Sequence, residues 1–258
     1  MREYLLTCEN VSNYGEAVRR LRRLPRRVTL RIPIQWNDDE GHIDDPNDYV
    51  NAFRALSAVA DVMIQFADSS AMKHFTPRSF DHHVKECLSV LGSFCKSAEA
   101  GNEVNGNWLG DRTAEKVQRA LTACSHTNLH TVVTYYLSAD QPRQMFDWIA
   151  RHPLRSKYAL ISHYPNTTPD SSADPLNVFA EFSRAFPNST VGWGEYGTED
   201  ADDNNTASMD ERARLVRLVE REWWELIAPR VGNYAGLGGY WDWATDSALD
   251  QTFGEVWA

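Results

Sequence analysis

Short apolar runs rich in β-branched and aromatic residues recur along the chain, and stretches with helical periodicity separate them. After Asp210, apolar side chains recur mostly at three- and four-residue intervals, the spacing of one helix face: Leu215, Leu218, Val219, Trp223 and Leu226. This alternation predicts βαβ units and a parallel sheet. The runs expected to form strands are 4–10, 28–36, 60–68, 94–103, 129–137, 158–165, 190–197 and 236–243.

Eight strands are the number that closes a (β/α)₈ barrel, and 258 residues is the usual length of one such domain. We therefore expect residues 1–258 to form a single minimal barrel. An open doubly wound sheet is the alternative, because it also alternates strands with helices. That fold usually has a glycine-rich phosphate turn after its first strand, whereas the first strand here ends in Cys8-Glu9-Asn10.

Two predicted strands end in a glutamate that lies in a glycine-containing motif. The fourth ends in E-A-G-N-E-V-N-G (99–106), and the seventh in G-W-G-E-Y-G (192–197). Glu103 and Glu195 thus stand at the C-terminal ends of strands, where barrel enzymes hold their catalytic groups. Strands four and seven are roughly opposed around a barrel, so both side chains can reach one mouth. A retaining glycosidase needs such a pair, one proton donor and one nucleophile.

The two motifs resemble those of clan A of the glycoside hydrolases, which are retaining (β/α)₈ enzymes. In that clan the acid/base follows an Asn at the end of strand four, and the nucleophile ends strand seven. The resemblance implies hydrolysis of O-glycosidic bonds in an oligo- or polysaccharide by double displacement. Glu103 would be the general acid/base and Glu195 the nucleophile, with Asn102 bonded to the sugar 2-hydroxyl. No cofactor or metal is implied.

The resemblance also points to aromatic and polar substrate-binding residues. His163 and Tyr164 end the sixth strand, where the clan often keeps a Tyr that hydrogen-bonds the nucleophile. Trp241 lies on the eighth strand, where the clan often places a Trp beneath the −1 sugar. Strand alternation lets only one of Trp241 and Trp243 face inward. Two further residues in strand-to-helix loops are expected to stack on neighbouring sugars: Trp36 and Trp108.

The chain departs from the clan pattern at one supporting residue. Many members carry an Arg near the end of strand two that supports the nucleophile. Arg31 lies in the second predicted strand but well before its end, so its position does not predict that role.

The composition of the chain limits the classes of molecule that it is expected to bind. The formal net charge of −10 argues against nucleic-acid binding, which requires clustered Lys and Arg. The one basic cluster, within 19–27, reads as a solvated helix face and its exit loop. No apolar run approaches the length of a membrane span. A carbohydrate substrate is the expected partner, and the oligomeric state is not predicted.

Two features of the sequence indicate the cellular compartment in which the protein is expected: the spacing of its cysteines and the composition of its first residues. The cysteines at positions 8, 87, 95 and 124 match no metal motif, so we expect reduced, buried thiols. Residues 1–10 contain no apolar signal core. These features predict a cytoplasmic protein, or a secreted one if the natural chain was trimmed.

Two other functions fit a barrel of this kind. A carbohydrate-binding barrel with weak or no turnover is one, although intact glutamates at both positions argue against it. A metal-dependent hydrolase or an aldolase-type barrel is the other. It would need a His/Asp cluster or a strand-end Lys, and the sequence contains neither.

Overall fold

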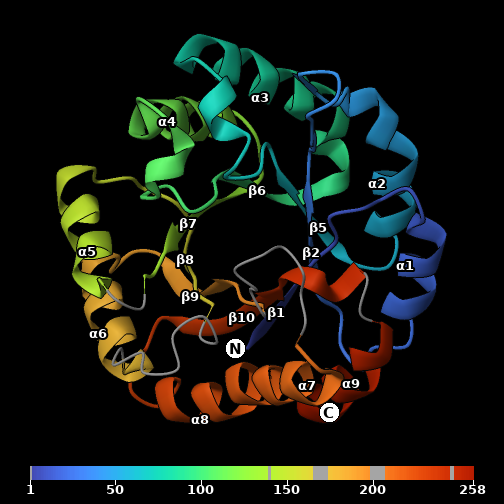
Figure 1. Ribbon diagram of the computed structural model, residues 1–258, viewed down its shortest axis with the longest axis vertical. Helices are drawn as coiled ribbons and strands as arrows, with labels where there is room; N and C mark the ends of the chain where they lie inside the picture. The colour runs from blue at the N-terminus through green and yellow to red at the C-terminus, as the bar shows by residue number, and fades with distance from the viewer. Residues whose placement is uncertain (1, 139–140, 165–173, 198–206, 245–246) are drawn as a thin grey trace.

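A computed structural model describes residues 2–138, 141–164, 174–197, 207–244 and 247–258. Parallel strands close into a barrel in the order β1-β10-β9-β8-β7-β6-β5-β2, with helices around it (Figure 1). The prediction of a (β/α)₈ barrel is confirmed. The barrel strands are β1 (Glu3–Thr7), β2 (Thr29–Pro33), β5 (Asp61–Gln65), β6 (Cys95–Gly101), β7 (His130–Tyr136), β8 (Tyr158–Ser162), β9 (Thr190–Glu195) and β10 (Tyr234–Tyr240).

Each strand lies largely within one of the predicted apolar runs. A short antiparallel hairpin, β3 (Trp36–Asn37) with β4 (His42–Ile43), follows β2 and was not predicted. The last strand starts two residues earlier than expected and ends at Tyr240. The chain then enters a 3₁₀ helix, η6 (Trp241–Ala244).

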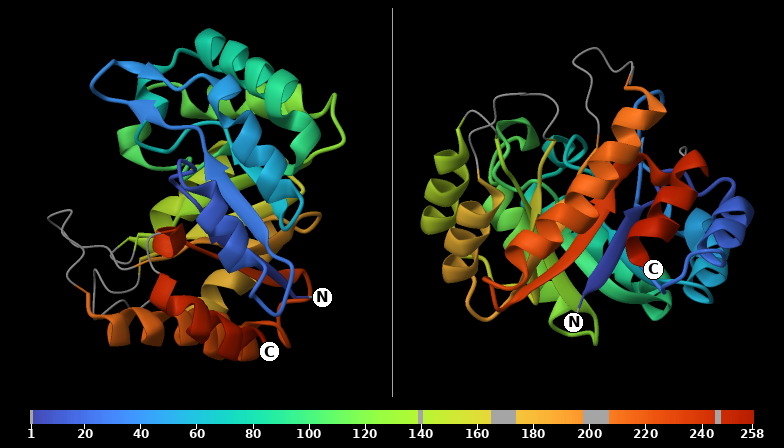
Figure 2. Two further views of the ribbon diagram at one scale, coloured as in Figure 1. Left: turned by 90° about the vertical axis from the view of Figure 1, so that its right-hand side faces the viewer. Right: turned by 90° about the horizontal axis from the view of Figure 1, so that it is seen from below.

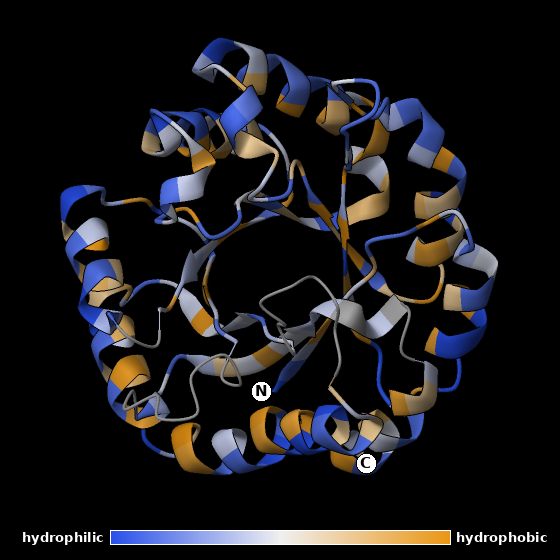
Figure 3. Cartoon of the chain, viewed as in Figure 1, coloured by the Kyte–Doolittle hydropathy of each residue, from blue (hydrophilic) through white to orange (hydrophobic). Residues whose placement is uncertain are grey.

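Helices cover the outer face of the barrel and turn their apolar sides toward it (Figure 3). Side-chain caps begin several of them, as at Thr76 and Ser208, where the two hydrogen bonds of a capping box are present. The α- and π-helices are α1 (Tyr14–Leu21), α2 (Val50–Ser57), α3 (Pro77–Leu91), α4 (Thr113–Cys124), α5 (Pro142–Arg151), α6 (Pro175–Ala185), α7 (Met209–Arg217), the π-helix η5 (Leu218–Trp223), α8 (Trp224–Ile227) and α9 (Asp250–Trp257). The remaining 3₁₀ turns are η1 (Pro46–Tyr49), η2 (Met72–His74), η3 (Gly92–Phe94), η4 (Asn107–Leu109) and η7 (Ser247–Leu249). No helix in these ranges is long and apolar enough to cross a membrane.

Strand alternation sorts side chains between two cores. Residues such as Leu30 and Ile64 face the helices and join the large outer core. The alternate positions face the barrel interior, where a separate apolar cluster forms toward the N-terminal ends of the strands: Leu5, Met63, Val132, Leu160 and Leu237. Two residues further along the same strands the interior becomes polar, with Gln65, Thr134 and Ser162. The fold therefore presents a polar layer at the end where the strands finish.

The barrel closes where β1 pairs with β10, the first strand with the last. Seen from below, these strands lie side by side (Figure 2). Two glycines of β10 also lie unusually close to elements other than β1, namely β9 and the π-helix η5. A Cβ on Gly239 would lie 2.1 Å from the Gly194 carbonyl oxygen, and one on Gly238 would lie 2.2 Å from Oε1 of Glu220. Only glycine fits at these two positions.

Candidate active site

Glu103 and Glu195 line one cavity at the C-terminal end of the barrel, with a volume of about 520 Å³. Its lining residues end or follow seven different barrel strands: Glu9, Asp68, Ser69, Ser70, Glu103, Trp108, Tyr136, Tyr164, Glu195 and Trp241. This is the end at which a (β/α)₈ barrel carries its chemistry. The structure thus brings together two glutamates that are far apart in the sequence.

Glu103 stands on a tight turn that follows β6. Its backbone is left-handed, with φ of 50°, a conformation that costs a non-glycine residue about 1–2 kcal/mol. Two residues earlier, a Cβ on Gly101 would lie 2.6 Å from Val104 and Val117 side chains. The glycine of the motif therefore lets the chain turn against α4, which places Glu103 in the cavity and Asn102 against Glu195.

The surroundings of Glu103 favour its protonated form. Its carboxyl group accepts hydrogen bonds from the hydroxyl of Ser162 at 2.6 Å and that of Ser69 at 3.1 Å, and these two contacts lower its pKa, but larger effects oppose them. Burial raises the pKa of Glu103 well above its ordinary value, and the negative charge of Glu195 raises it further. Among the described residues, Glu103 forms no ion pair. Its protonated form is suited to donating a proton.

Glu195 ends β9 in a different environment. Its Oε2 accepts hydrogen bonds from Arg31 at 2.8 Å and from Asn102 at 3.2 Å, and Tyr164 donates its hydroxyl to Oε1. Burial raises the pKa of Glu195 to about 7, while Arg31 and Tyr164 oppose that rise. Because only Glu195 has a cation beside it, it ionises before Glu103.

Arg31 supports Glu195 from the middle of β2, so its early position in the strand does not prevent that role. The guanidinium is fully buried and lies between two carboxylates, 2.8 Å from Glu195 and 3.1 Å from Glu99. Thr134 donates its hydroxyl to Glu99. The strands of a barrel are staggered, and the long Arg side chain spans the remaining distance to the end of β9.

Three of the predicted substrate-binding residues line the cavity, and Asn102 contacts Glu195 without lining it. Asn102 is buried beside Glu195; its Nδ2 donates to that carboxylate, and its Oδ1 has no partner among the described residues. Tyr164, Trp108 and Trp241 line the cavity. Trp108 meets Tyr136 edge to face, with ring centroids 5.2 Å apart. These side chains provide both flat and polar surface around the two glutamates.

Besides Asn102, two of the predicted substrate-binding residues do not line the cavity, contrary to expectation. His163 is buried on the helix side, where its ring stacks on Trp193 and Trp223 and its Nδ1 lies 3.2 Å from the carbonyl of Leu137. It is a core histidine, because alternation turns it away from Tyr164. Trp36 lies on the β3–β4 hairpin and stacks on His74 at 4.1 Å.

The choice between Trp241 and Trp243 is resolved in favour of Trp241. Trp243 is fully buried beneath the guanidinium of Arg20, which lies 4.2 Å from its ring, and its Nε1 donates to Asp250. The premise of strand alternation was wrong, since both residues belong to a 3₁₀ helix rather than to β10.

Other cavity residues were not predicted from the sequence. Glu9, Asp68, Ser69, Ser70 and Tyr136 all line it. Each lies at or within a few residues of the end of a barrel strand, which is a usable signal in this fold. Nothing in their residue types separates them from ordinary loop residues.

The described residues hold no group of three or more His, Cys, Asp or Glu arranged for a metal ion. The four cysteines are buried and free, as their spacing predicts. Burial raises the pKa of each thiol, so none is primed as a nucleophile.

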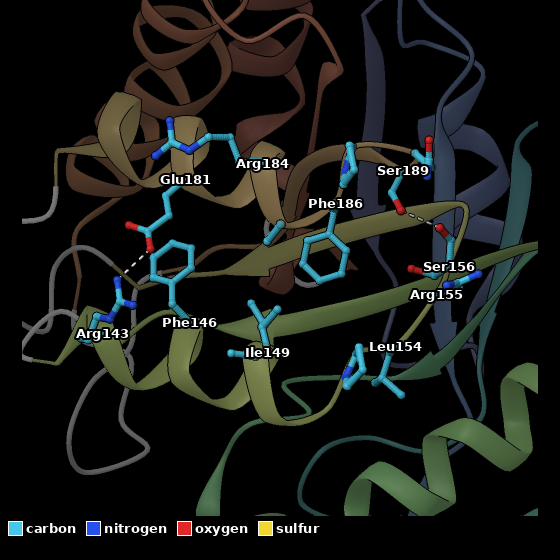
Figure 4. Close-up of a pocket in the computed structure, with 15 residues that line it drawn as sticks. Arg143, Phe146, Ile149, Leu154, Arg155, Ser156, Glu181, Arg184, Phe186 and Ser189 are labelled. Carbon is cyan, nitrogen blue, oxygen red and sulfur yellow. Dashed lines mark hydrogen bonds and ion pairs between the residues drawn. The ribbon is translucent and has the colours of Figure 1, made fainter.

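A larger cavity, of about 1030 Å³, lies on the outer wall between α5 and α6 (Figure 4). Its floor is apolar, with Phe146 and Phe186, and its one carboxylate, Glu181, accepts a hydrogen bond from Arg143 at 2.8 Å. No pair of carboxyl groups faces this groove. The smaller cavity therefore remains the candidate active site.

Neither the protein-family models nor the curated protein sequences match this chain. Solved structures do match, at low identity. A glycoside hydrolase family 5 enzyme from Prevotella bryantii B14 is 13% identical, with 99% of this chain and 96% of that chain covered and a TM-score of 0.60. An endo-β-1,4-mannanase of family 26 from Bacillus sp. JAMB-750 is 10% identical, covering 99% and 85%, with a TM-score of 0.61. A β-glucanase from Saccharophagus degradans is 15% identical, covering 99% and 86%, with a TM-score of 0.58. At such identities the likeness shows the fold: this chain has the (β/α)₈ barrel that these glycoside hydrolases share.

Proposed function

We propose that this chain is a retaining glycoside hydrolase of clan A that cleaves O-glycosidic bonds of an oligo- or polysaccharide. One observation carries the proposal. Two buried carboxyl groups share a cavity, and their surroundings separate their pKa values. Glu195 lies against a guanidinium and a phenol, whereas Glu103 lies against two hydroxyls and a like charge. Divergent carboxyl environments of this kind assign an acid and a base.

In the first step, the Glu195 carboxylate attacks the anomeric carbon while the bond from that carbon to the leaving oxygen breaks. Glu103 gives its proton to the leaving oxygen. Arg31 and Tyr164 keep Glu195 ionised before the attack. The products are a glycosyl ester on Glu195 and an ionised Glu103.

The second step reverses the role of Glu103. Once Glu195 is an ester it has no negative charge, so the pKa of Glu103 falls. Glu103 then removes a proton from water, the water oxygen bonds to the anomeric carbon, and the ester bond breaks. Configuration at the anomeric carbon is retained because each step inverts it once.

The cavity lining supports a carbohydrate as the substrate. Trp108 and Trp241 offer aromatic faces, and the seryl and tyrosyl hydroxyls offer hydrogen bonds. Apolar walls with a few directed polar groups are typical of small-molecule sites. One of the matching structures is a mutant of the family 5 enzyme in complex with a xyloglucan tetradecasaccharide.

Azide rescue of two variants tests the roles. With an activated aryl glycoside, Glu103→Ala should still form the glycosyl-enzyme, because such a leaving group needs little protonation. Added azide then restores turnover with retained configuration. Glu195→Ala has no nucleophile, so azide attacks from the opposite face and yields the inverted product. Glu181→Ala, in the outer groove, should behave as wild type.

The anomeric configuration of each azide product is the readout. Swapped configurations would reverse the two roles. Wild-type activity in both variants would end the enzyme proposal. A fluorosugar inactivator that labels Glu195 separates a hydrolase from a carbohydrate-binding barrel, since the latter takes no covalent label.

A further inference from the structure

The active-site cavity has more negative charge than double displacement requires. Besides the two proposed catalytic glutamates, its lining includes the carboxylates of Glu9 and Asp68, and none of its described lining residues is a Lys or an Arg. The other lining residues are Ser, Tyr and Trp. Arg31 lies beneath and is already bonded to Glu99 and Glu195. A sugar entering this cavity therefore meets carboxylates and neutral groups.

The same bias extends to the fully described segments that follow β1, β2, β5 and β6. Each of these segments contains at least one Asp or Glu, and the only Lys or Arg among them are Lys73 and Arg112. The segments are 8–13, 34–45, 66–76 and 102–112. Arg112 is paired with Glu115 at 2.6 Å. Charge of one sign around a cleft concentrates ligands of the other sign.

Asp68 is the extra carboxylate best placed to meet a substrate. It is half-buried, and its Oδ2 accepts hydrogen bonds from the backbone and hydroxyl of Ser70, at 3.0 and 2.7 Å. Both of these donors are neutral. No described residue forms an ion pair with Asp68. Its charge raises the pKa of both Glu103 and Glu195, so it acts on the reacting centre. Asp68 is held in place without being neutralised.

Asn102 adds a second acceptor beside the nucleophile. Its Nδ2 is used on Glu195, which leaves the buried Oδ1 without a partner in the described part of the chain. A buried acceptor of this kind is costly unless a ligand supplies a donor. A protonated amine consists of donors alone, and it satisfies both an amide oxygen and a carboxylate.

Resting on the proposed function, we propose that the substrate is a glycan of hexosamine units with free, protonated amino groups, and that Asp68 determines this specificity. Neutral glycans lack a charge to complement Asp68. Glycans that carry uronate or sulfate groups are repelled by the same carboxylate. Deacetylated amino sugars are the one common class whose charge matches the cavity.

Calorimetric titration of Glu103→Gln, which binds without turnover, tests the proposal. Three β-1,4-linked hexasaccharides of equal length serve as ligands, with an amine, an acetamide or a hydroxyl at carbon 2: the glucosamine, N-acetylglucosamine and glucose hexamers. At pH 5.5 and low salt the amine ligand should bind about tenfold tighter than the other two. This preference should shrink as salt screens the charges.

Asp68→Asn in the same background should remove most of the preference, whereas Asp61→Asn should keep it. Asp61 begins β5, the strand that Asp68 follows, at the opposite end of the barrel, and it pairs with exposed Arg27. Equal or weaker binding of the amine ligand, or no binding of any of the three, overturns the proposal. The comparison needs no variant at Asp68, so misfolding of Asp68→Asn would not obscure it.

The two proposals fail separately. Fluorosugar labelling of Glu195 and cleavage of a neutral aryl glycoside report on the hydrolase alone. If both succeed while the amine ligand shows no advantage, the hydrolase stands and the amino-sugar specificity falls. If the amine ligand binds selectively while Glu195 is never labelled, the specificity stands and hydrolysis falls.

Discussion

At the scale of single residues, the hydroxyl of Tyr164 helps to decide when Glu195 becomes a nucleophile. Tyr164→Phe removes a donor to the carboxylate and leaves Arg31 in place. A hydrogen bond to a charged group contributes about 1.5–3 kcal/mol, so the pKa of Glu195 should rise by about one unit. The acid limb of kcat/KM against pH should then move to higher pH, with about tenfold lower activity below it.

The alkaline limb of the same profile depends on Glu103 and should hardly move. Tyr158→Phe is the matched control, because Tyr158 begins β8, the strand that Tyr164 follows, and donates to Glu3 at the far end of the barrel. Equal loss of activity at every pH would show that Tyr164 acts on substrate binding instead.

The residue scale also shows how far a sequence can be interpreted. Glu103, Asn102 and Tyr164 could be predicted because each stands at a strand end within a recognisable pattern. Arg31 could not, because its function depends on side-chain reach and strand stagger, which the linear sequence does not record. His163 was misjudged because one residue of alternation separates the cavity from the core.

At the scale of elements, the π-helix η5 places a buried glutamate behind the active site. Glu220 accepts hydrogen bonds from Tyr196 at 3.0 Å and from Trp257 at 3.0 Å, and it pairs with Arg2. Glu220→Gln removes the negative charge. It also replaces one accepting oxygen with an NH₂ group, which cannot accept a hydrogen bond from Tyr196, Trp257 or Arg2. Breaking a buried ion pair costs about 3–5 kcal/mol, so the melting temperature should fall by about 10 °C.

Thermal unfolding of Glu222→Gln supplies the control for this effect, since Glu222 is exposed on the same π-helix. An unchanged melting temperature in Glu220→Gln would contradict a stabilising role for the Glu220 cluster.

A buried lysine links two of the elements that shape the cavity. Lys116 on α4 donates to the carbonyl of Met72 in η2 at 2.9 Å and to that of Leu109 in η4 at 3.4 Å. Lys116→Met leaves two acceptors unpaired and releases η4, which carries Trp108. We expect KM for oligosaccharides to rise several-fold, while kcat on a small aryl glycoside stays near wild type.

Lys85→Met, on the exposed side of α3, should change neither constant. A rise in KM for both substrates alike would show that Lys116 supports the whole site rather than the Trp108 wall.

The hairpin β3–β4 and the 3₁₀ turn η6 belong to the elements that sequence periodicity missed. Both are shorter than the repeat needed to recognise a pattern.

At the scale of the whole molecule, buried carboxyl groups make stability depend on pH. Burial raises the pKa of Glu99, Glu103, Glu195 and Glu220 in the folded protein. Between their unfolded values and these raised values, the folded state binds more protons than the unfolded state. Stability therefore falls as pH rises through this window, which for Glu195 extends from 4.5 to about 7.

The melting temperature should accordingly be highest near pH 5 and fall by at least about 5 °C by pH 8. Calorimetry across this range measures the slope. Glu103→Gln removes one of the buried carboxyl groups and should therefore make the slope of melting temperature against pH shallower. Glu181→Gln should leave that slope unchanged. A melting temperature that rises from pH 5 to pH 8 would contradict this account.

The seam between β1 and β10 has a consequence for the synthesis of the chain. A ribosome makes β1 first and β10 more than two hundred residues later, so the pair that closes the barrel joins residues as distant as Glu3 and Gly236. Until then β1 and β9 each present an unpaired edge, a template for association with other chains. Contacts of such long range also slow folding. The nascent barrel is thus exposed to aggregation until its last strand emerges, and chaperone capture should be greatest for chains halted before Tyr234.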